Sequence, residues 1–304
     1  MKKVLAFLLV VGGIAAAVAY LLSTPETLPA QEVAQAGDGD AVRGETLFWA
    51  GGCASCHAAP GAKGEAKLVL TGGVKLESPF GTFVAPNISA SAADGIGGWS
   101  LEDFANAMLK GTSPEGEHYF PAFPFTSYSR MTLGDVSDLF AFMKTLPAVD
   151  GKAAEHEIGF PFNIRRAVGF WKLLYLDPAP VIAAPSGSDV DQAVWQRGRY
   201  LVEGPGHCSE CHTPRNAIGG LDKSRWLAGA TAPVGDGKIP DITPGEGGIG
   251  SWSAGDIAYY LESGFTPDYD SVGGEMVSVQ ENMAHLAASD RAAIAVYLKA
   301  LPER

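Results

Sequence analysis

The chain has 304 residues, of which 46% are hydrophobic and 18% are charged, and its formal net charge is −12. This composition is typical of folded protein and excludes an intrinsically disordered chain, and the length is sufficient for two domains of ordinary size. So acidic a chain is a poor ligand for nucleic acid. We expect no nucleic-acid partner, and instead either a protein partner with a positive docking face or an acidic surface that serves solubility alone.

An uncharged apolar run over residues 4–22 follows two lysines at the amino terminus. A helix of that length spans about 28 Å, close to the ~30 Å hydrocarbon core of a bilayer, whereas the apolar core of a cleaved signal peptide has only about 7–15 residues. We therefore predict that residues 1–23 are a membrane anchor or signal segment, and we favour a single uncleaved anchor in the inner membrane. With the lysines in the cytoplasm, the rest of the chain faces the periplasm. Residues 24–39 are expected to be a tether.

All four cysteines lie in two Cys-x-x-Cys-His motifs, formed by Cys53, Cys56 and His57 and by Cys208, Cys211 and His212. Three chemistries use paired cysteines: a four-thiolate zinc site, a redox-active dithiol, and covalent attachment of a c-type haem. The zinc site leaves no role for a histidine directly after each pair, and the redox dithiol expects a strand before the motif. Haem attachment uses every residue, because each histidine then becomes an axial iron ligand. We predict two covalently bound haem c groups. Thioether attachment of haem takes place on the exported side of the membrane, in agreement with the predicted orientation.

The two motifs belong to an internal repeat, since Cys53 and Cys208 are 155 positions apart (208 − 53) and so are His57 and His212 (212 − 57). Three further pairs of segments recur in the same order: 86–89 with 240–243, 95–100 with 248–253, and 145–147 with 300–302. One domain is therefore used twice, at residues 40–150 and 189–304, with a connector at 151–188.

Each copy is predicted to be helical. A helix is expected before each haem motif, near residues 40–50 and 190–203. Ser100 and Ser253 are expected to cap a second helix, and Thr132 and Ser289 to cap the last one.

A haem that only carries electrons needs a second axial ligand, and methionine supplies a thioether that raises the reduction potential. In the first copy Met131 lies in a loop shortly before the last helix, while Met108 and Met143 fall on apolar helical stripes that are typical of core packing. The second copy offers Met276 and Met283, and spacing from the histidine does not decide between them.

Three segments of the chain carry a resemblance to a known family: residues 111–128, residues 160–166 (FPFNIRR), and residues 195–216 around the second motif. They resemble the cytochrome c subunits of bacterial membrane-bound alcohol, gluconate and related periplasmic dehydrogenases, over nearly all of the chain from about residue 40. The resemblance implies an all-α fold of two tandem class I-type cytochrome c domains behind the N-terminal transmembrane helix. That family usually carries three haems, so this chain is expected to be a dihaem relative, which leaves the identity of its partner open.

The resemblance also bears on the methionines. The family's Gly-Gly-x-Met segment supplies the C-terminal haem ligand, which favours Met276 over Met283. Where the family often has methionine in a Pro-Ala-x-Pro segment this chain has Phe123, so Met131 is the only loop candidate in the first copy.

Three further side chains are candidates for contact with the haem propionates. Trp99 and Trp252 occupy equivalent places in the repeat and could donate indole N–H bonds, although packed core aromatics would look the same. Arg215 could offset propionate charge, as could Arg165 and Arg166, and exposed arginine is the competing interpretation.

The predicted function is electron transfer and not catalysis. Electrons would pass from a periplasmic dehydrogenase or respiratory complex to a mobile cytochrome c or terminal oxidase. Two alternatives are a dihaem subunit integral to a respiratory oxidase complex, and a haem enzyme, either a peroxidase or a thiosulfate-oxidising cytochrome. A peroxidase needs an open sixth position, and the thiosulfate type resembles a cysteine-ligated haem, for which no cysteine is left.

Overall fold

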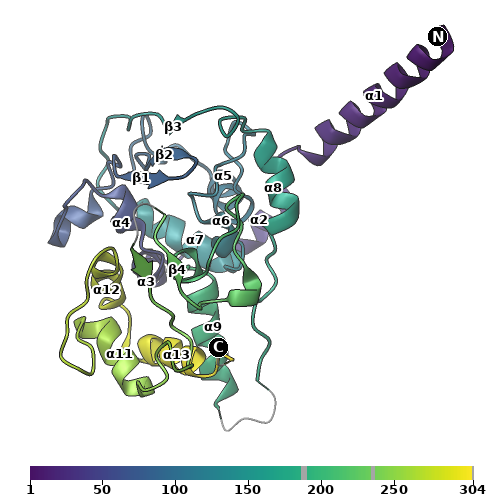
Figure 1. The fold of residues 1–304 in the computed structure, drawn as a ribbon. Helices are drawn as coiled ribbons and strands as arrows, with labels where there is room; N and C mark the ends of the chain where they lie inside the picture. Colours follow the sequence, from purple (N-terminus) through teal and green to yellow (C-terminus); the bar gives the residue numbers. More distant parts are fainter. Residues whose placement is uncertain (186–189, 234–236, 303–304) are drawn as a thin grey trace.

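The computed structural model describes residues 1–185, 190–233 and 237–302 (Figure 1). The α-helices are α1 (Lys2–Leu22), α2 (Ala30–Val33), α3 (Ala41–Ala50), α4 (Cys53–His57), α5 (Leu101–Ala105), α6 (Phe125–Tyr128), α7 (Leu133–Met143), α8 (Ala167–Tyr175), α9 (Gln192–Glu203), α10 (Ser209–His212), α11 (Ala254–Ser263), α12 (Met276–Met283) and α13 (Ala288–Lys299). The short 3₁₀ or π turns are η1 (Ala34–Ala36), η2 (Gly64–Leu68), η3 (Asn106–Lys110) and η4 (Lys223–Arg225). The strands are β1 (Lys75–Ser78), β2 (Gly81–Val84), β3 (Glu157–Ile158), β4 (Ala230–Thr231) and β5 (Lys238–Ile239).

Each half is built on a close crossing of its first and last helices, α3 with α7 and α9 with α13. A glycine makes each crossing possible. A Cβ at Gly44 would lie 2.0 Å from the Asp138 carbonyl oxygen, and one at Gly198 would lie 1.9 Å from the Ala293 carbonyl oxygen. These glycines are 154 positions apart (198 − 44), so the repeat in the sequence is a repeat of helix packing.

An arginine–aspartate pair fastens each crossing. In the first half Arg43 Nε and Nη2 donate to the two carboxylate oxygens of Asp138 at 2.7 and 2.9 Å. In the second half Arg197 Nε and Nη2 donate to Asp290 at 2.8 Å each. Bidentate pairs of this kind fix direction as well as distance, so they hold the angle between the helices.

Three of the four predicted helix caps are confirmed. The hydroxyls of Ser100, Ser253 and Thr132 each accept a hydrogen bond from the backbone N–H three residues later. The prediction for Ser289 is wrong: α13 starts at Ala288, its cap is Ala287, and Ser289 lies in the first turn. The chain enters this helix at the position that the repeat equates with Thr132 (287 − 132 = 155), where alanine has no capping side chain.

Among the residues that the structure describes, two small antiparallel sheets make the all-α prediction approximate. β1 pairs with β2, and β3 from the connector adds a third strand through Gly81–Ile158 and Thr82–Glu157 pairing. β4 and β5 form the other sheet. The connector thus contributes both a strand and helix α8. It packs on the first half through β3 and Lys172, and it contacts the second half through bonds such as Trp171 Nε1 to the Ile218 carbonyl at 2.9 Å.

The segment expected to be a tether, residues 24–39, also lies against the first half. The Leu28 amide donates to Asn106 Oδ1 at 2.7 Å, the Thr112 hydroxyl donates to the Glu26 carbonyl at 2.8 Å, and Val33 is buried. These hydrogen bonds pair backbone groups of the segment with the first half, whereas its composition had suggested a backbone exposed to solvent.

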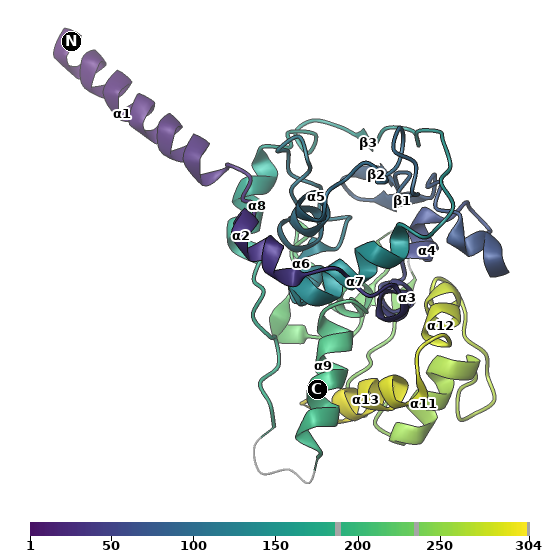
Figure 2. The ribbon, with the colours of Figure 1, turned by 180° about the vertical axis from the view of Figure 1, so that it is seen from behind.

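Helix α1 projects away from the rest of the molecule in both ribbon views and buries none of its residues (Figures 1 and 2). Its length and composition would allow it to cross a membrane. Elsewhere, one apolar cluster runs through both halves and includes Phe48 and Leu139 as well as Trp195 and Tyr297. The two halves therefore share a core.

Candidate functional site

Each cysteine motif forms a short helical turn at the end of a tight bend. Gly52, with φ +60°, caps α4, which holds the first motif, and His207, with φ +37°, precedes the second motif at the start of α10. A helical turn places positions i and i+3 on the same side. The two sulfurs of each pair are thus presented together, and the histidine follows directly.

Both histidines are held in the same way. Nδ1 of His57 lies 2.8 Å from the carbonyl oxygen of Pro86, and Nδ1 of His212 lies 2.8 Å from that of Pro240. A carbonyl only accepts, so Nδ1 carries the proton in each ring and Nε2 is left with a free lone pair for a metal. Burial lowers the pKa of both imidazoles, which favours the neutral form that ligates iron.

The cysteines lack the properties of a redox dithiol. Burial raises the pKa of Cys53 and of Cys208 to about 12. Redox-active pairs instead have a lowered pKa that keeps the thiolate available. Within the ranges that the structure describes, no three His, Cys, Asp or Glu side chains converge as a zinc site requires. Thiols in pairs, each beside an imidazole with a free Nε2, fit covalent haem attachment.

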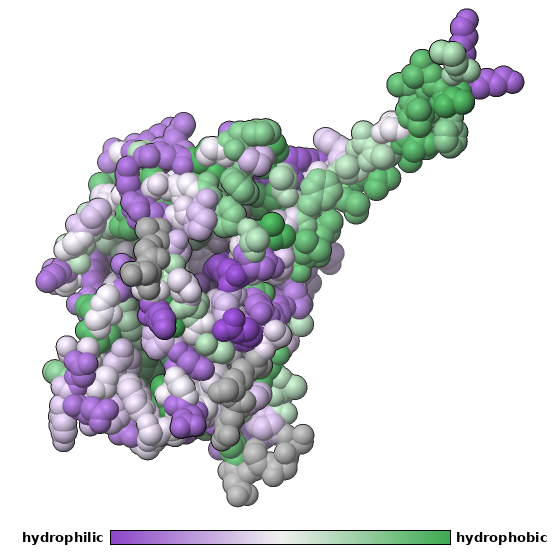
Figure 3. All heavy atoms as spheres, viewed as in Figure 1, coloured by the Kyte–Doolittle hydropathy of each residue, from purple (hydrophilic) through white to green (hydrophobic). Residues whose placement is uncertain are grey.

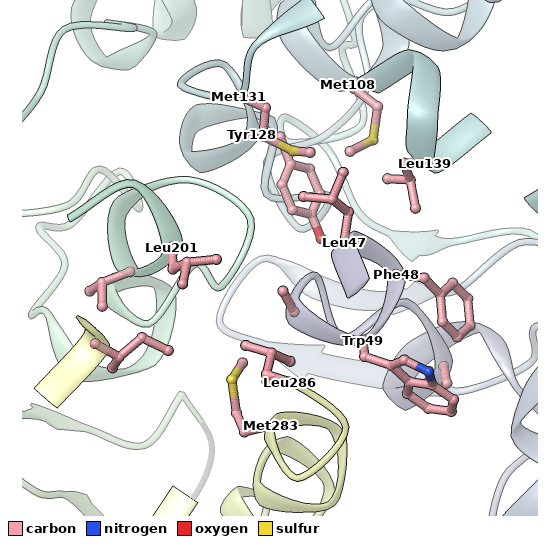
Figure 4. Packing of buried hydrophobic residues seen from close by; sticks show 14 of the residues in the cluster. Leu47, Phe48, Trp49, Met108, Tyr128, Met131, Leu139, Leu201, Met283 and Leu286 are labelled. Carbon is pink, nitrogen blue, oxygen red and sulfur yellow. The ribbon is translucent and has the colours of Figure 1, made fainter. Parts of the chain in front are cut away.

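The candidate methionines lie in or against the shared core. Met131 is 6% exposed and sits between α6 and α7, near Tyr128 and Leu47 (Figure 4). Met276, the first residue of α12, is partly buried against the same cluster, and Met283 at the other end of that helix is 4% exposed. Packing therefore keeps both second-half candidates close to the core.

The predicted propionate partners have mixed surroundings. Trp99 and Trp252 are partly buried against the core, and in each half a lysine at the carboxyl end of the last helix contacts the loop that holds the tryptophan. Lys144 Nζ lies 3.4 Å from the Trp99 carbonyl oxygen, and Lys299 Nζ lies 2.9 Å from that of Gly250. The two tryptophans therefore have similar, though not identical, surroundings, and their contact with propionates stays a prediction.

The arginines are already engaged. Arg215 forms an ion pair with Glu210 and donates to the Gly219 carbonyl at 2.8 Å. Arg165 donates to the His118 carbonyl, and Arg166 binds the end of helix α1. Arg166 thus serves the base of the apolar helix, whereas Arg165 pairs with Glu117.

The two motifs are brought side by side, which the sequence did not predict. The carbonyl oxygen of Gly51, two residues before Cys53, accepts from the Tyr128 hydroxyl at 3.1 Å and from His207 Nε2 at 3.2 Å. Besides burial, the nearby Cys211 thiol raises the pKa of Cys56. The attachment turns of the first and second halves are therefore neighbours.

We call the contact region between the first and second halves the seam. Two equivalent positions of the motifs, Ser55 and Glu210, make contacts across it, and each lies directly before the second cysteine of its motif (210 − 55 = 155). The Ser55 hydroxyl accepts from Asn282 Nδ2 and meets the Ser278 hydroxyl, both at 2.7 Å, in the second half. Glu210 accepts from the hydroxyls of Thr126 at 3.1 Å and Ser127 at 2.8 Å in the first half. The sequence holds one indication of these contacts: the residue directly before the second cysteine, which the motif leaves free to vary, is polar in both copies.

An aromatic contact extends the seam. The indole of Trp49 in α3 stacks on the imidazole of His285, just after α12, with ring centroids 3.8 Å apart and planes within 6°. Lys67 and Glu281 form an ion pair beside it. Helix α12, which begins with Met276, is thereby fixed against the first motif.

Comparison with known proteins gives a consistent result. The cytochrome c family model matches residues 41–147. A dihaem c-type cytochrome of Cereibacter sphaeroides is 56% identical over 264 residues, covering 87% of this chain and 86% of that protein. The fructose dehydrogenase cytochrome subunit of Gluconobacter japonicus is 36% identical, covering 86% of this chain and 52% of the subunit. The gluconate 2-dehydrogenase cytochrome c subunit of Pantoea cypripedii is 34% identical, covering 88% and 60%.

The chain thus spans most of its dihaem relative but only about half to three-fifths of these two dehydrogenase subunits. The resemblance predicted from the sequence is confirmed, and the relatives are electron carriers and not the catalytic subunits of their complexes. The chain has two Cys-x-x-Cys-His motifs, each with a histidine whose Nε2 is free to bind iron. It belongs to the dihaem c-type cytochromes, electron-transfer proteins that bind two haem c groups covalently.

Proposed function

We propose that the protein is a membrane-anchored periplasmic cytochrome that passes electrons from a dehydrogenase to a mobile cytochrome c or terminal oxidase. The observation that carries the proposal is the direct contact of the two attachment turns, in which His207 Nε2, directly before Cys208, donates to the carbonyl oxygen of Gly51. Neighbouring turns support transfer between the haems inside one chain. Residues 40–150 and 189–304 would be the two tandem class I-type cytochrome c domains.

The proposed attachment residues are Cys53 and Cys56 in the first half and Cys208 and Cys211 in the second. The proposed axial ligands are His57 with Met131 and His212 with Met276. When bound, haem iron supplies one-electron redox chemistry. The chain's own contribution is to fix each imidazole through its proline carbonyl, to exclude water with a shared apolar core, and to offer a thioether in place of an open position. Trp99, Trp252 and Arg215 are proposed to support the propionates.

The donor is proposed from the relatives named above, which are subunits of fructose and gluconate dehydrogenases. The acidic surface, at a net charge of −12, supports docking to a partner with a positive face. Helix α1, apolar and without a buried residue, supports anchoring in the inner membrane with the haem-binding halves outside.

The haem assignment is tested by removing one motif at a time. A Cys53→Ser/Cys56→Ser variant and its matched counterpart, Cys208→Ser/Cys211→Ser, should each retain half of the covalently bound haem of the wild type, measured by pyridine haemochrome after acid-acetone extraction. Full haem retention in either variant would refute the assignment of that motif.

The partner is tested by mild detergent extraction of the wild-type protein from native membranes, followed by identification of what co-purifies. We expect a dehydrogenase whose substrate reduces both haems. Co-purification with a haem–copper oxidase alone would favour the alternative role as an oxidase subunit. Rapid binding of carbon monoxide to the reduced protein would contradict six-coordinate ligation.

A further inference from the structure

Helix α8 exposes its apolar face and buries its charged residue. Phe170, Leu173 and Leu174 are 42%, 57% and 68% exposed, whereas Lys172 is only 8% exposed. A helix on the surface of a water-soluble protein normally has the opposite pattern. An apolar helix face of this kind indicates a surface that something other than water covers.

The inward face of α8 is specifically bonded, so its orientation is fixed. Lys172 Nζ donates to the carbonyl oxygens of Lys110 at 2.6 Å and Gly111 at 2.7 Å, at the carboxyl end of η3. Its ammonium lies 4.9 Å from the centre of the Phe125 ring. Val168, on the same side, packs with Phe83 and Phe120 in a second small core cluster. The outward direction of the apolar residues follows from these contacts.

The loop before α8 extends the exposed apolar area. Phe160 is 82% exposed, Phe162 48% and Ile164 45%. Together with the three outward residues of α8 they form what we call the apolar patch: Phe160, Phe162, Ile164, Phe170, Leu173 and Leu174. In the space-filling view, hydrophobic surface gathers on the body close to the point where α1 leaves it (Figure 3).

The apolar patch is fastened to the end of α1. Arg166 Nη2 donates to the Tyr20 carbonyl at 2.6 Å and to the Thr24 hydroxyl at 3.0 Å, and its Nε donates to the Ser23 hydroxyl at 2.9 Å. A Cβ at Gly169 would lie 2.7 Å from Ser23, so α8 touches the chain at this point. The guanidinium also complements the negative end of the helix dipole. The last turn of α1 and the patch therefore move as one unit.

The position of this unit identifies what covers the patch. If α1 spans the membrane, which rests on the proposed function, its last turn lies at the headgroup level, and so does everything bonded to Tyr20 and Ser23. Apolar side chains at that level bury about 5–10 Å into the headgroup and acyl boundary, and tryptophan and tyrosine favour the same zone. Tyr20, in the last turns of α1, lies in this zone. Arg166 places positive charge here, where anionic lipids attract it, whereas Arg165 is paired with Glu117.

We propose that the apolar patch is an interfacial membrane-binding surface for the phospholipids of the periplasmic leaflet. With α1 it provides a second contact, which stops the haem-binding halves from rotating freely about the anchor. The occupant is a lipid surface of phosphatidylethanolamine and phosphatidylglycerol chemistry, because the patch is continuous with the anchor.

The experiment measures immersion depth by electron paramagnetic resonance. A nitroxide is attached by oxime ligation to p-acetylphenylalanine introduced at Leu173, with Phe162 as a second site, so that the four cysteines stay intact. Val42, an apolar residue 80% exposed on α3, is the matched control, and Leu9 in α1 reports on the anchor. The full-length holoprotein is placed in phosphatidylethanolamine/phosphatidylglycerol liposomes without any partner.

We expect labels at Leu173 and Phe162 to collide readily with oxygen and several-fold less with a water-soluble nickel chelate than the label at Val42 does. Nickel accessibility at both patch sites equal to that at Val42, with Leu9 lipid-immersed, would overturn this inference and leave the anchor intact. Nickel accessibility at Leu9 would instead refute the proposed anchor. Shielding that appears only after addition of a co-purified dehydrogenase would show a protein occupant and overturn the lipid assignment.

Discussion

At the residue scale, the sulfur of Met131 is the group on which the potential of the first haem should depend. It is 6% exposed in the loop before α7. A Met131→His variant should lower the midpoint potential of one haem only, within the ~0.8 V range that axial ligands set, because a nitrogen ligand stabilises the oxidised iron more than a thioether does. A potentiometric titration followed by absorbance measures this.

Met108 provides the control, since it is similarly buried, at 5%, but lies in the π turn η3. A Met108→Leu variant should titrate like the wild type. A shift of equal size in both variants would show that packing, and not ligation, is responsible.

Met276 is the proposed ligand of the second haem, and Met283 is the alternative at the other end of α12. Met276→Leu should abolish the thioether-to-iron charge-transfer absorption of one haem, whereas Met283→Leu, a nearly volume-conserving change in the core, should keep it and cost under about 1.5 kcal/mol of stability. Near-infrared absorbance of the oxidised protein distinguishes them. The reverse result would move the ligand to Met283.

At the scale of the elements, the helix crossings depend on glycines. Gly44→Ala or Gly198→Ala would place a Cβ about 2 Å from a backbone oxygen of the opposing helix. Forcing the helices apart should lower the free energy of unfolding by about 1–3 kcal/mol or more. Gly134→Ala is the matched control: it lies in α7, its nearest contact would be 3.9 Å away, and alanine should stabilise the helix by up to about 1 kcal/mol.

Guanidinium denaturation of the three variants provides the measurement. Equal stability of Gly44→Ala and Gly134→Ala would mean that the crossing tolerates separation and that the close approach has no structural role.

Helix α8 gives a pH-dependent prediction. Burial lowers the pKa of Lys172 from 10.5 to about 7. Between about pH 7 and 10.5 the unfolded chain therefore binds more protons than the folded one, so the free energy of unfolding rises with pH over this window. Relative to Lys172→Met, the wild type should gain stability between pH 7 and pH 9. Denaturation curves at both values check this, and a constant difference between the two proteins would contradict it.

The sequence predicted those elements whose cause is local. Thr132 caps a helix through a bond three residues away, and the motif histidines follow from chemistry within five residues. It did not predict the exposed face of α8, because the bonds of Lys172 to Lys110 and Gly111 join positions about sixty residues apart. For the same reason the contact of Ser55 with Asn282 could not be inferred from periodicity.

At the scale of the whole molecule, the seam between the halves should couple them. Ser55→Ala removes the hydroxyl that bonds to Asn282 and Ser278 across the seam and should cost about 1 kcal/mol, the net value of a typical hydrogen bond. It should also slow electron equilibration between the haems, measured by pulse radiolysis. Ser271→Ala, at an exposed serine of the second half, should change neither quantity. Unchanged kinetics in Ser55→Ala would show that the seam is structural only.

The placement of Ser55 and Glu210 inside their motifs has a consequence for biogenesis. Each residue sits between the two thiols that must react with a porphyrin, and each is bonded to the opposite half once the chain is folded. A thioether forms only when the porphyrin can reach the thiol, and the contacts of Ser55 and Glu210 with the opposite half cover the turn that carries the thiols. Both prosthetic groups must therefore be joined to the nascent chain before the halves close on one another, so that interdomain docking becomes the last step of maturation.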